Sequence, residues 1–532
     1  MPGRTRLLSS GSNGTGQLGI GHAEDVSTWT DCSFDDAPAG SSDIRVRKDP
    51  PGRVLAIASG AGHAILLLKD EAGQAAATAS QFDSASIWTT GSYLARQLGP
   101  SYSIGDIRPA HTVWKRLDTD RYLLLAGLEV SCEYRYTPIH VACSWTTTFI
   151  CFTRTKQMKQ LEGGGSQRLS DIIISFGTND FGELGAGIAR GGDSSSGKLK
   201  NPVHLVKFSE QDDYKGIISV RKMKASHRNI ACIVDLVPEE GLPGLSESRL
   251  FGWGAGRHGQ LDPKTGVTAN GQTSSTQTEQ RIPRSPHSTR TVATESSSTV
   301  GTRRAVGRIK YKKSEFPSSH PAPVSVDARS VLKLDSDAEL HFDDLAVGAG
   351  HMVLRVSNAR DGLRNAIVGF GDNAKAQLSF GPLESTRWGS IACTWNGTFM
   401  TALDRSPQIY TTGANTHGQL GYEDSVLISE AGSQASSGGN QVARVIETQW
   451  GAENLDIVCG SEHVIVLATQ NATSTKGWLW GWNEHGNLGL DDVLDRWTPT
   501  RISLDSNLNI MGVWAGCGTS WVAVEEIIDF ER

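Results

Sequence analysis

No apolar run in this 532-residue sequence is long enough to cross a bilayer, and the longest, such as "AILLL" from Ala64, have the length of a strand. The N-terminal stretch "MPGRTRLLSSGSNG" lacks the apolar core of a secretory signal. The eight cysteines include no Cys-x-x-Cys pair, so we expect reduced, structural thiols in an intracellular protein rather than disulfides or zinc. The net charge of −6 disfavours direct binding to nucleic acid.

Enzyme signatures are missing as well, because no nucleophile elbow, metal-ligand spacing or carboxylate pair stands out. One stretch could hold a phosphate: "GSNGTGQLGIGH" from Gly11 to His22, which follows a short apolar run. A phosphate loop needs a helix after its glycines, and the residues after Gly19 are a poor helix start with no Gly-Lys-Ser/Thr nearby. The sequence therefore predicts no catalytic residue, no metal site and no cofactor.

Glycine is abundant, with 59 residues, and its placement repeats along the chain. A Gly with Leu seven residues later occurs seven times, each time after a short apolar or aromatic run that is typical of a strand. We expect the first Gly to end the strand with backbone angles that other residues avoid, and the Leu to fold back as an apolar plug. These structural turns begin at Gly11, Gly91, Gly177, Gly254, Gly371, Gly413 and Gly481.

A second element alternates with the glycine turns and also occurs seven times, for example "IASGAGHAILL" from Ile57 and "IVCGSEHVIVL" from Ile457. It predicts a strand, a crossing of small residues and a second apolar strand. His63, His351 and His463 share one position in it, and Cys143, Cys393 and Cys459 share another. A close metal triad is not indicated by copies in separate repeats, so we expect each histidine to bond the backbone at a turn.

These repeats predict an all-β fold, a seven-bladed β-propeller. Segments such as "RPAHTVWKRL" and "RWTPTRISL" follow the glycine turns and carry proline, which suits an outer strand. The chain begins with a strand and a glycine turn and ends with the second element, so the first and last fragments complement one another. We therefore expect the ring to be closed by pairing of the N- and C-terminal strands, which removes a free sheet edge.

The propeller is interrupted between the fourth and fifth glycine turns. We expect residues 1–261 to form its first part, 262–320 a disordered basic insertion, and 321–532 its second part. The insertion contains ten Lys/Arg and four Asp/Glu. Its run "RRAVGRIKYKK" from Arg303 suits a nuclear-import signal, a site for acidic partners or a solvated loop, and Ser285 before Pro286 is a potential phosphorylation site.

The alternation of "G-x-N-x-x-G-Q-L-G" with "G-x-x-H" resembles the repeat of the regulator of chromosome condensation family. The start "GSNGTGQLGIGHAEDVSTW", and an end at the last repeat, are most similar to a fungal branch of alpha-tubulin suppressors, also called killer-toxin-insensitivity proteins. That resemblance implies a partner, a small zinc-binding electron carrier of the diphthamide pathway. It also implies support of diphthamide synthesis and of Elongator-dependent modification of tRNA wobble uridines, in the cytoplasm with the nucleus as a second compartment.

The leading hypothesis is thus a non-enzymatic adaptor, a monomeric ring or a heterodimer with its partner, without membrane contact. Candidate partner-binding residues are His22, Glu24 and Asp25 after the first turn, with Trp145 and Trp395 at one repeat position. The tryptophans could instead pack between blades, and the acids could be merely solvated. A guanine-nucleotide exchange factor or other regulator of a small GTPase is the alternative, although the short N-terminal stretch and acidic charge do not favour it.

Overall fold

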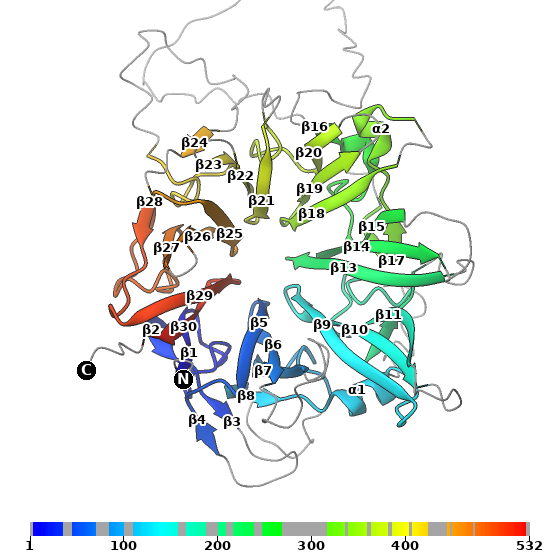
Figure 1. Ribbon diagram of the computed structural model, residues 1–532, viewed down its shortest axis with the longest axis horizontal. Helices are drawn as coiled ribbons and strands as arrows, with labels where there is room; N and C mark the ends of the chain where they lie inside the picture. Colours follow the sequence, from blue (N-terminus) through cyan, green and yellow to red (C-terminus); the bar gives the residue numbers. More distant parts are fainter. Residues whose placement is uncertain are drawn as a thin grey trace, which may run out of the picture.

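The computed structural model describes residues 4–35, 45–70, 85–100, 110–157, 166–187, 201–208, 216–238, 247–268, 317–335, 339–358, 363–380, 386–403, 407–423, 444–446, 450–471 and 474–527. Seven sheets, antiparallel apart from one short parallel pair, stand around a central axis like the blades of a propeller (Figure 1). The seven-bladed all-β fold is therefore confirmed. The described helices, α1 (Thr119–Leu125) and α2 (Arg329–Leu332), are far too short to cross a membrane.

Each blade has four strands that follow one another from the axis outward. The inner strands are β5 (Gly52–Ser59), β9 (Tyr134–Cys143), β13 (Gly216–Ser226), β18 (His341–Val347), β21 (Trp388–Cys393), β25 (Asn454–Cys459) and β29 (Leu508–Ala515). The second strands are β6 (His63–Asp70), β10 (Thr147–Gln157), β14 (Asn229–Pro238), β19 (His351–Asn358), β22 (Gly397–Ala402), β26 (His463–Asn471) and β30 (Thr519–Glu526). The third strands are β7 (Ala85–Ser92), β11 (Ser166–Gly177), β15 (Glu247–Ala255), β20 (Leu363–Gly371), β23 (Gln408–Gly413), β27 (Ser474–Gly481) and β1 (Thr5–Gly11).

The fourth strands lie farthest from the axis. They are β8 (Ala110–Arg116), β12 (His204–Val206), β17 (Ser319–Ser325), β16 (Val267–Thr268), β24 (Arg444–Ile446), β28 (Arg496–Arg501) and β2 (Val26–Asp31). The proline-bearing segments predicted as outer strands are β8, β12, β17 and β28, which confirms their position. Proline is tolerated there because an outer strand leaves half of its backbone groups without a ladder partner.

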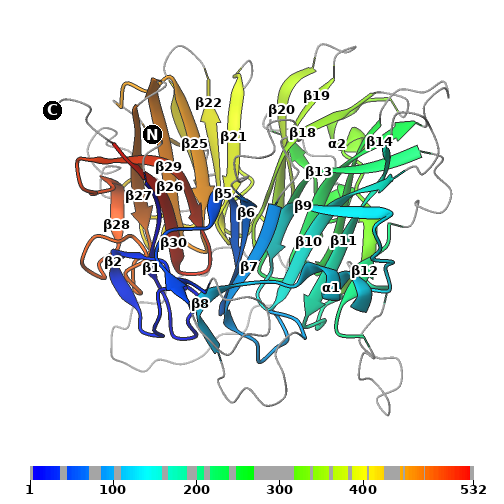
Figure 2. The same ribbon diagram turned by 60° about the horizontal axis from the view of Figure 1, so that its bottom comes forward.

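The last blade joins the two ends of the chain, as the sequence predicted. Strand β1 pairs antiparallel with β30, from Thr5 opposite Glu525 to Gly11 opposite Thr519. The blade has the order β2-β1-β30-β29, so its two inner strands are C-terminal and its two outer strands N-terminal. Figure 2 shows these strands side by side. The ring is thereby closed by seven backbone-paired positions rather than by side chains alone.

Two outer edges differ from the simple repeat. The first blade has six strands, because β3 (Phe34–Asp35) and β4 (Val46–Arg47) are added outside β8. The fourth blade takes its outer strand, β16, from the segment that follows the third blade's glycine turn. In both places, the segment after one blade's glycine turn adds strands to the outer edge of the following blade. Neighbouring blades are thereby linked by strand pairing as well as by side-chain packing.

The ends of the expected insertion are structured, which corrects its boundaries. Residues 263–265 form the short 3₁₀ helix η1 (Pro263–Thr265), capped by the Asp262 carboxylate, and β16 follows it. At the other end, β17 begins at Ser319. The polar composition hid η1 and β16, because a short outer strand needs few apolar residues. Strand β17 was predicted as an outer strand, and only its first residues fall within the expected insertion. Residues 269–316, with Ser285 and the run from Arg303, lie outside the described residues, and their disorder stays a prediction.

The core is divided into seven apolar clusters, each between two neighbouring blades. Strands of the second and third blades, for example, interlock through Phe149, Cys151, Ile230 and Trp253, all at most 1% exposed. Each sheet stands radially, so its middle strands pack against neighbouring blades on both faces, and β6 and β10, for example, are buried over their first six residues. The rigidity of the ring therefore comes from packing between blades rather than from one central core.

The glycine turns hold the blades together at their ends. All seven turn-starting glycines have φ between 96° and 127°, and a Cβ on any of them would lie 2.2–2.6 Å from a backbone carbonyl oxygen. The seven plug leucines are Leu18, Leu98, Leu184, Leu261, Leu378, Leu420 and Leu488, each at most 6% exposed. Both predicted roles are confirmed. The asparagine of the motif is explained too: its Oδ1 accepts from the plug leucine's N–H, at 3.0 Å for Asn13 and 2.8 Å for Asn483.

Candidate protein-interaction face

One face of the ring carries both repeated loops. In each blade the residue after the small-residue crossing lies opposite the glycine that starts the turn, as in the pairs His63 with Gly91 and His463 with Gly481. All seven turns and all seven crossings therefore lie at the same end of the strands. We call this end the turn-side face. It presents fourteen loops, held by glycines and backbone hydrogen bonds, around the axis.

The crossing histidines lock neighbouring blades together beneath this face. The Nε2 atoms of His63, His351 and His463 lie 2.9, 3.2 and 3.0 Å from hydroxyl oxygens of the next blade, on Thr148, Thr398 and Ser520 respectively. The sequence predicted a backbone partner, and a backbone hydrogen bond with Gly397 or Thr519 does act on His351 and His463, but the Nε2 contact with a side-chain hydroxyl was not predicted. The hydroxyl belongs to the blade that follows in the chain, and a single-repeat pattern does not show which side chain a neighbouring repeat brings in.

The chemistry of these histidines follows from their burial. Thr148 donates its proton to the carbonyl oxygen of Gln97 at 2.6 Å, so its oxygen accepts from the Nε2–H of His63. Burial lowers the pKa of His63 to about 3, and that of His351 and His463 to about 4. All three are neutral near pH 7. The glycine of "G-x-x-H" is required because a Cβ on Gly60 would lie 2.4 Å from the His63 ring.

Two predicted partner-binding residues meet at the axis of this face. Trp145 and Trp395 come from blades on different sides of the ring, yet their ring centroids lie 5.7 Å apart. His227, at the same repeat position, lies 5.0 Å from Trp145 and 5.4 Å from Trp395. All three are half-buried. Burial, with the charges of Arg228 and Arg257, lowers the pKa of His227, which is therefore neutral.

This axial aromatic cluster (Trp145, His227, Trp395) is held by its own backbone. The Trp145 N–H donates to the His227 carbonyl at 2.9 Å, and the Trp145 carbonyl accepts from the Ala61 N–H at 2.9 Å. The Trp395 N–H donates to the Ser461 carbonyl at 2.8 Å in the same manner. Five of the seven pairs of neighbouring crossings are joined by such a backbone bond, which fixes the aromatic rings by backbone geometry. Sequence reasoning missed His227, although the alignment of "SHRN" with "SWTT" would have found it.

A cavity of about 100 Å³ opens beside the cluster. Its wall includes the thiols of Cys143, Cys393, Cys459 and Cys517. Burial raises the pKa of Cys143 and Cys393 to about 12 and that of Cys517 to about 11, so these thiols are protonated and poor nucleophiles. All eight cysteines are free. Within the described ranges no three His, Cys, Asp or Glu side chains converge to hold a metal ion.

The other predicted residues lie at the rim, on the turn of the closing blade. His22, Glu24 and Asp25 are exposed. The Asp25 carboxylate accepts from the Asn13 N–H at 2.7 Å and, with its other oxygen, lies 2.7 Å from Nδ1 of His485 in the neighbouring turn. The Asn13 side chain in turn donates to the carbonyls of His22 and Glu24. Asp25 therefore anchors its own loop and joins two blades, while His22 and Glu24 leave their side chains at the surface.

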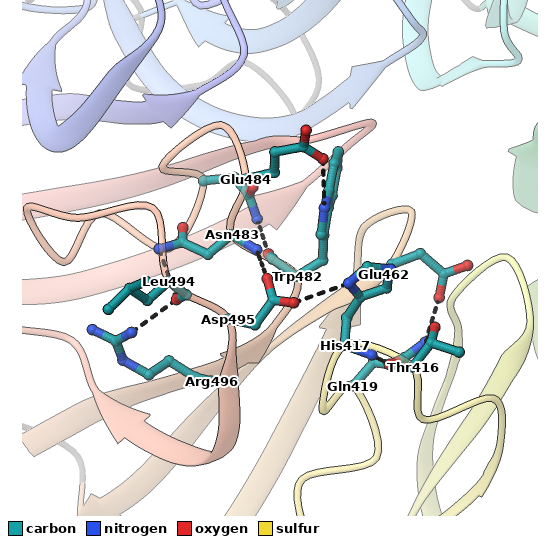
Figure 3. A network of polar contacts seen from close by, with 11 residues as sticks. Thr416, His417, Gln419, Glu462, Trp482, Asn483, Glu484, Leu494, Asp495 and Arg496 are labelled. Carbon is teal, nitrogen blue, oxygen red and sulfur yellow. Dashed lines mark hydrogen bonds and ion pairs between the residues drawn. The ribbon is translucent and has the colours of Figure 1, made fainter.

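The neighbouring turn repeats this arrangement (Figure 3). Asp495 accepts from the Asn483 N–H at 2.8 Å and lies 2.9 Å from Nδ1 of His417. Asp25 and Asp495 thus have the same role, each twelve residues after its turn asparagine. The stretch after Gly19 does not look like the stretch after Gly489, because residues 20–24 and 490–494 differ in sequence. The spacing from Asn to Asp is the signal that would have revealed the shared role.

A half-buried carboxylate completes this network. Glu462 accepts from the Asn396 side chain at 2.9 Å and from Gln419 at 3.0 Å, and so links three loops of two blades. Burial raises its pKa. Trp482 lies between the two histidine pairs, with its ring 6.4 Å from His417 and 5.2 Å from His485. It remains half-buried, so the rim has an aromatic surface of its own, separate from the axial aromatic cluster.

The comparisons agree with this reading of the repeats. Residues 478–523 match the family model of the regulator of chromosome condensation (RCC1) repeat. The chain is 31% identical over 137 residues to a mouse secretion-regulating guanine nucleotide exchange factor, a match that covers 24% of this chain and 28% of the relative. It is 23% identical over 227 residues to human RCC1 domain-containing protein 1, covering 35% of this chain and 58% of the relative. These matches support the RCC1 repeat family; the chain spans less than a third of the mouse relative.

Solved structures give the same fold. The Saccharomyces cerevisiae protein Prp20p, described with its binding to Gsp1p and histones, has a TM-score of 0.51 at 14% identity, covering 99% of this chain and 93% of the other. Yeast RCC1 (Prp20) in a complex with Kap60 has a TM-score of 0.53 at 15% identity, covering 99% and 90%. Human WBSCR16 has a TM-score of 0.51 at 13% identity, covering 97% and 99%. At these identities the likeness concerns the propeller alone.

Proposed function

We propose that this chain is a non-enzymatic propeller adaptor whose turn-side face binds a protein partner. The observation that carries the proposal is the axial aromatic cluster. Two tryptophans and a neutral histidine are half-buried on a face that is otherwise built of small residues and turns. Rigid aromatic side chains on a pre-organised surface are typical anchors of protein interfaces, since little conformational entropy is lost when they are covered.

The structural relatives favour the same class of function. Prp20p is described as binding Gsp1p and histones, and as bound by Kap60, so related propellers serve as protein-binding surfaces. For this chain we take the partner to be a small zinc-binding electron carrier of the diphthamide pathway. Through it, the chain would support diphthamide synthesis and Elongator-dependent tRNA modification, in the cytoplasm with the nucleus as a second compartment. The support for that partner is the resemblance of the N-terminal turn to the fungal branch.

Affinity purification tests this proposal. The intact chain is used as bait, and recovery of the zinc protein is measured by mass spectrometry. The double variant Trp145→Ala/Trp395→Ala is expected to reduce recovery about tenfold or more. The matched control is Trp450→Ala, because Trp450 stacks on Trp478 at 4.4 Å and precedes the start of β25, at the opposite end of the strands. Full recovery with the axial variant, at unchanged folding, would contradict the proposal.

A regulator of a small GTPase is the second candidate, favoured by the 31% identity to a guanine nucleotide exchange factor. The assay is release of labelled GDP from Ran and other small GTPases in the presence of the intact chain. Acceleration that depends on Trp145 and Trp395 would replace the adaptor by an exchange factor on the same face. Absence of acceleration together with capture of the zinc protein would leave the adaptor as the function.

A further inference from the structure

The turn-side face has a strongly uneven distribution of charge. The turns and crossings of three consecutive blades, residues 11–25, 413–423, 459–463 and 481–495, contain eight Asp or Glu and no Lys or Arg. We call these residues the acidic sector. The corresponding charged segments of the other blades, residues 91–100, 177–187, 225–229, 254–266 and 371–380, contain four Asp or Glu and five Lys or Arg. We call these the mixed sector.

Only part of the acidic charge is needed to hold the fold. Asp25 and Asp495 anchor their turns, Glu462 is half-buried and hydrogen-bonded between loops, and Asp492 pairs with Arg496 at 2.5 Å just outside the sector. Glu24 and Glu484 are exposed, and within the part of the chain that the structure describes their carboxylates accept a single hydrogen bond, at 3.3 Å from Trp482 to Glu484. Carboxylates without a structural role create a negative potential that a partner of opposite charge can use.

Exposed apolar side chains lie within the same sector. Val493 and Leu494 are 56% and 65% exposed, and Trp497, just beyond them, is 36% exposed. They follow Asp491 and Asp492 directly in the chain. A large apolar side chain that neighbours acidic groups is typical of an interface in which charge sets the orientation and apolar burial provides affinity. The acidic sector therefore combines both features of a docking surface.

We propose that the acidic sector docks a Lys/Arg-rich segment of a partner protein, with an apolar side chain of that segment packed on Leu494 and Trp497. This inference rests on the proposed adaptor function but uses a surface distinct from the axial aromatic cluster. Charge complementarity selects the occupant, because the sector's segments carry eight acids and no Lys or Arg, and one neighbouring cation, Arg496, pairs with Asp492 alone; the remaining negative charge repels nucleic acid and acidic proteins. Binding through exposed charges weakens as salt screens them.

The test measures binding of a fluorescent peptide, RRAVGRIKYKK, to the intact chain by anisotropy. Glu484→Lys is expected to weaken binding about fivefold or more, and Leu494→Ser by a smaller factor. The matched controls lie in the mixed sector: Asp180→Lys makes the same charge change, and Leu94→Ser removes a leucine that is 76% exposed. Glu24→Lys serves as a second charge variant, and circular dichroism confirms that each variant is folded.

Three results would overturn the proposal. The first is equal weakening by Glu484→Lys and Asp180→Lys, because the effect would then be net charge alone. The second is equal binding of a peptide in which Gln replaces every Lys and Arg. The third concerns a chain that carries Arg303→Gln, Arg304→Gln, Lys312→Gln and Lys313→Gln. If this chain bound the peptide at least tenfold more tightly than the parent chain does, the chain's own residues 303–313 would be the occupant of the acidic sector rather than a partner protein. Failure of the peptide test with retained capture of the zinc protein would leave the proposed function standing.

Discussion

The acidic sector and the mixed sector are built on one framework and differ only in what that framework presents. In both, a glycine with positive φ starts each turn. An asparagine holds the plug leucine in all three acidic-sector turns and in two of the four mixed-sector turns, at 2.8 Å for Asn483 and 2.8 Å for Asn373. The charges differ at exposed turn positions, such as Lys375 in the mixed sector and Glu484 in the acidic sector. Surface chemistry can therefore vary along the ring without a structural cost.

The strongest test of a shared framework is a glycine substitution in each sector. Gly371→Ala and Gly481→Ala would each place a Cβ 2.4–2.6 Å from a carbonyl oxygen, at φ of 105° and 98°. We expect each to lower the free energy of unfolding by about 3 kcal/mol or more. Urea denaturation measures the loss. Gly14→Ala, where a Cβ meets nothing within 4 Å, is the control. If Gly371→Ala were as mild as Gly14→Ala, the turns would not be equivalent.

The buried histidines predict a similar pH dependence in both sectors. His463 belongs to the acidic sector, and His351 lies opposite Gly371, which starts a turn of the mixed sector. Burial lowers the pKa of each histidine from 6.5 to about 4. The unfolded chain binds the proton first, so stability is present above pH 6.5 and is lost as the pH falls toward 4. Each histidine should contribute a loss of roughly 2 kcal/mol between pH 6.5 and 5.

The measurement is the free energy of unfolding at pH 7 and pH 5 for the intact chain and for His463→Gln and His351→Gln. Each variant should show a smaller decrease on acidification than the parent, and the two decreases should match. A sector-specific difference would show that the surrounding acids, rather than burial, govern the titration.

The His–Asp ion pairs between neighbouring turns should differ between the sectors in coupling free energy, by a smaller amount than the effects above. In the acidic sector His417 and Asp495 lie 2.9 Å apart, whereas His258 and Asp372 in the mixed sector lie 4.0 Å apart. A double-mutant cycle at pH 6 should give a coupling free energy of about 0.5–1 kcal/mol for the first pair and about 0–0.3 kcal/mol for the second, since both are partly exposed. Equal couplings would contradict the distinction.

The smallest effect is expected at the exposed leucines. Leu494→Ser and Leu94→Ser should each change the free energy of unfolding by less than about 0.5 kcal/mol, because both side chains are largely exposed. Thermal denaturation checks this. A larger loss for Leu494→Ser would mean that Leu494 packs within the fold, and the docking role would lose its basis.

The periodicity of the sequence predicted the fold because the same turn, with its glycine and its buried leucine, occurs seven times. Gly11 and its six equivalents occur where a strand must turn back against a carbonyl, and no other residue fits there. Leu18 and its equivalents fill the space behind each turn. The closing blade followed from the same repeats, since an incomplete unit at each end leaves an unpaired edge. These constraints lie within a few residues of one another, so a single sequence shows them.

The tertiary structure decided what the repeats bring together. Trp145 and Trp395, 250 residues apart in the chain, meet because every crossing points at the axis. Asp25 pairs with His485 because the ring closes the first turn against the last. The acidic sector arises because residues 11–25 follow 481–495 around the ring. The sequence by itself determined the seven blades, whereas the side chains shared between blades depend on ring closure, which joins positions that no local pattern relates.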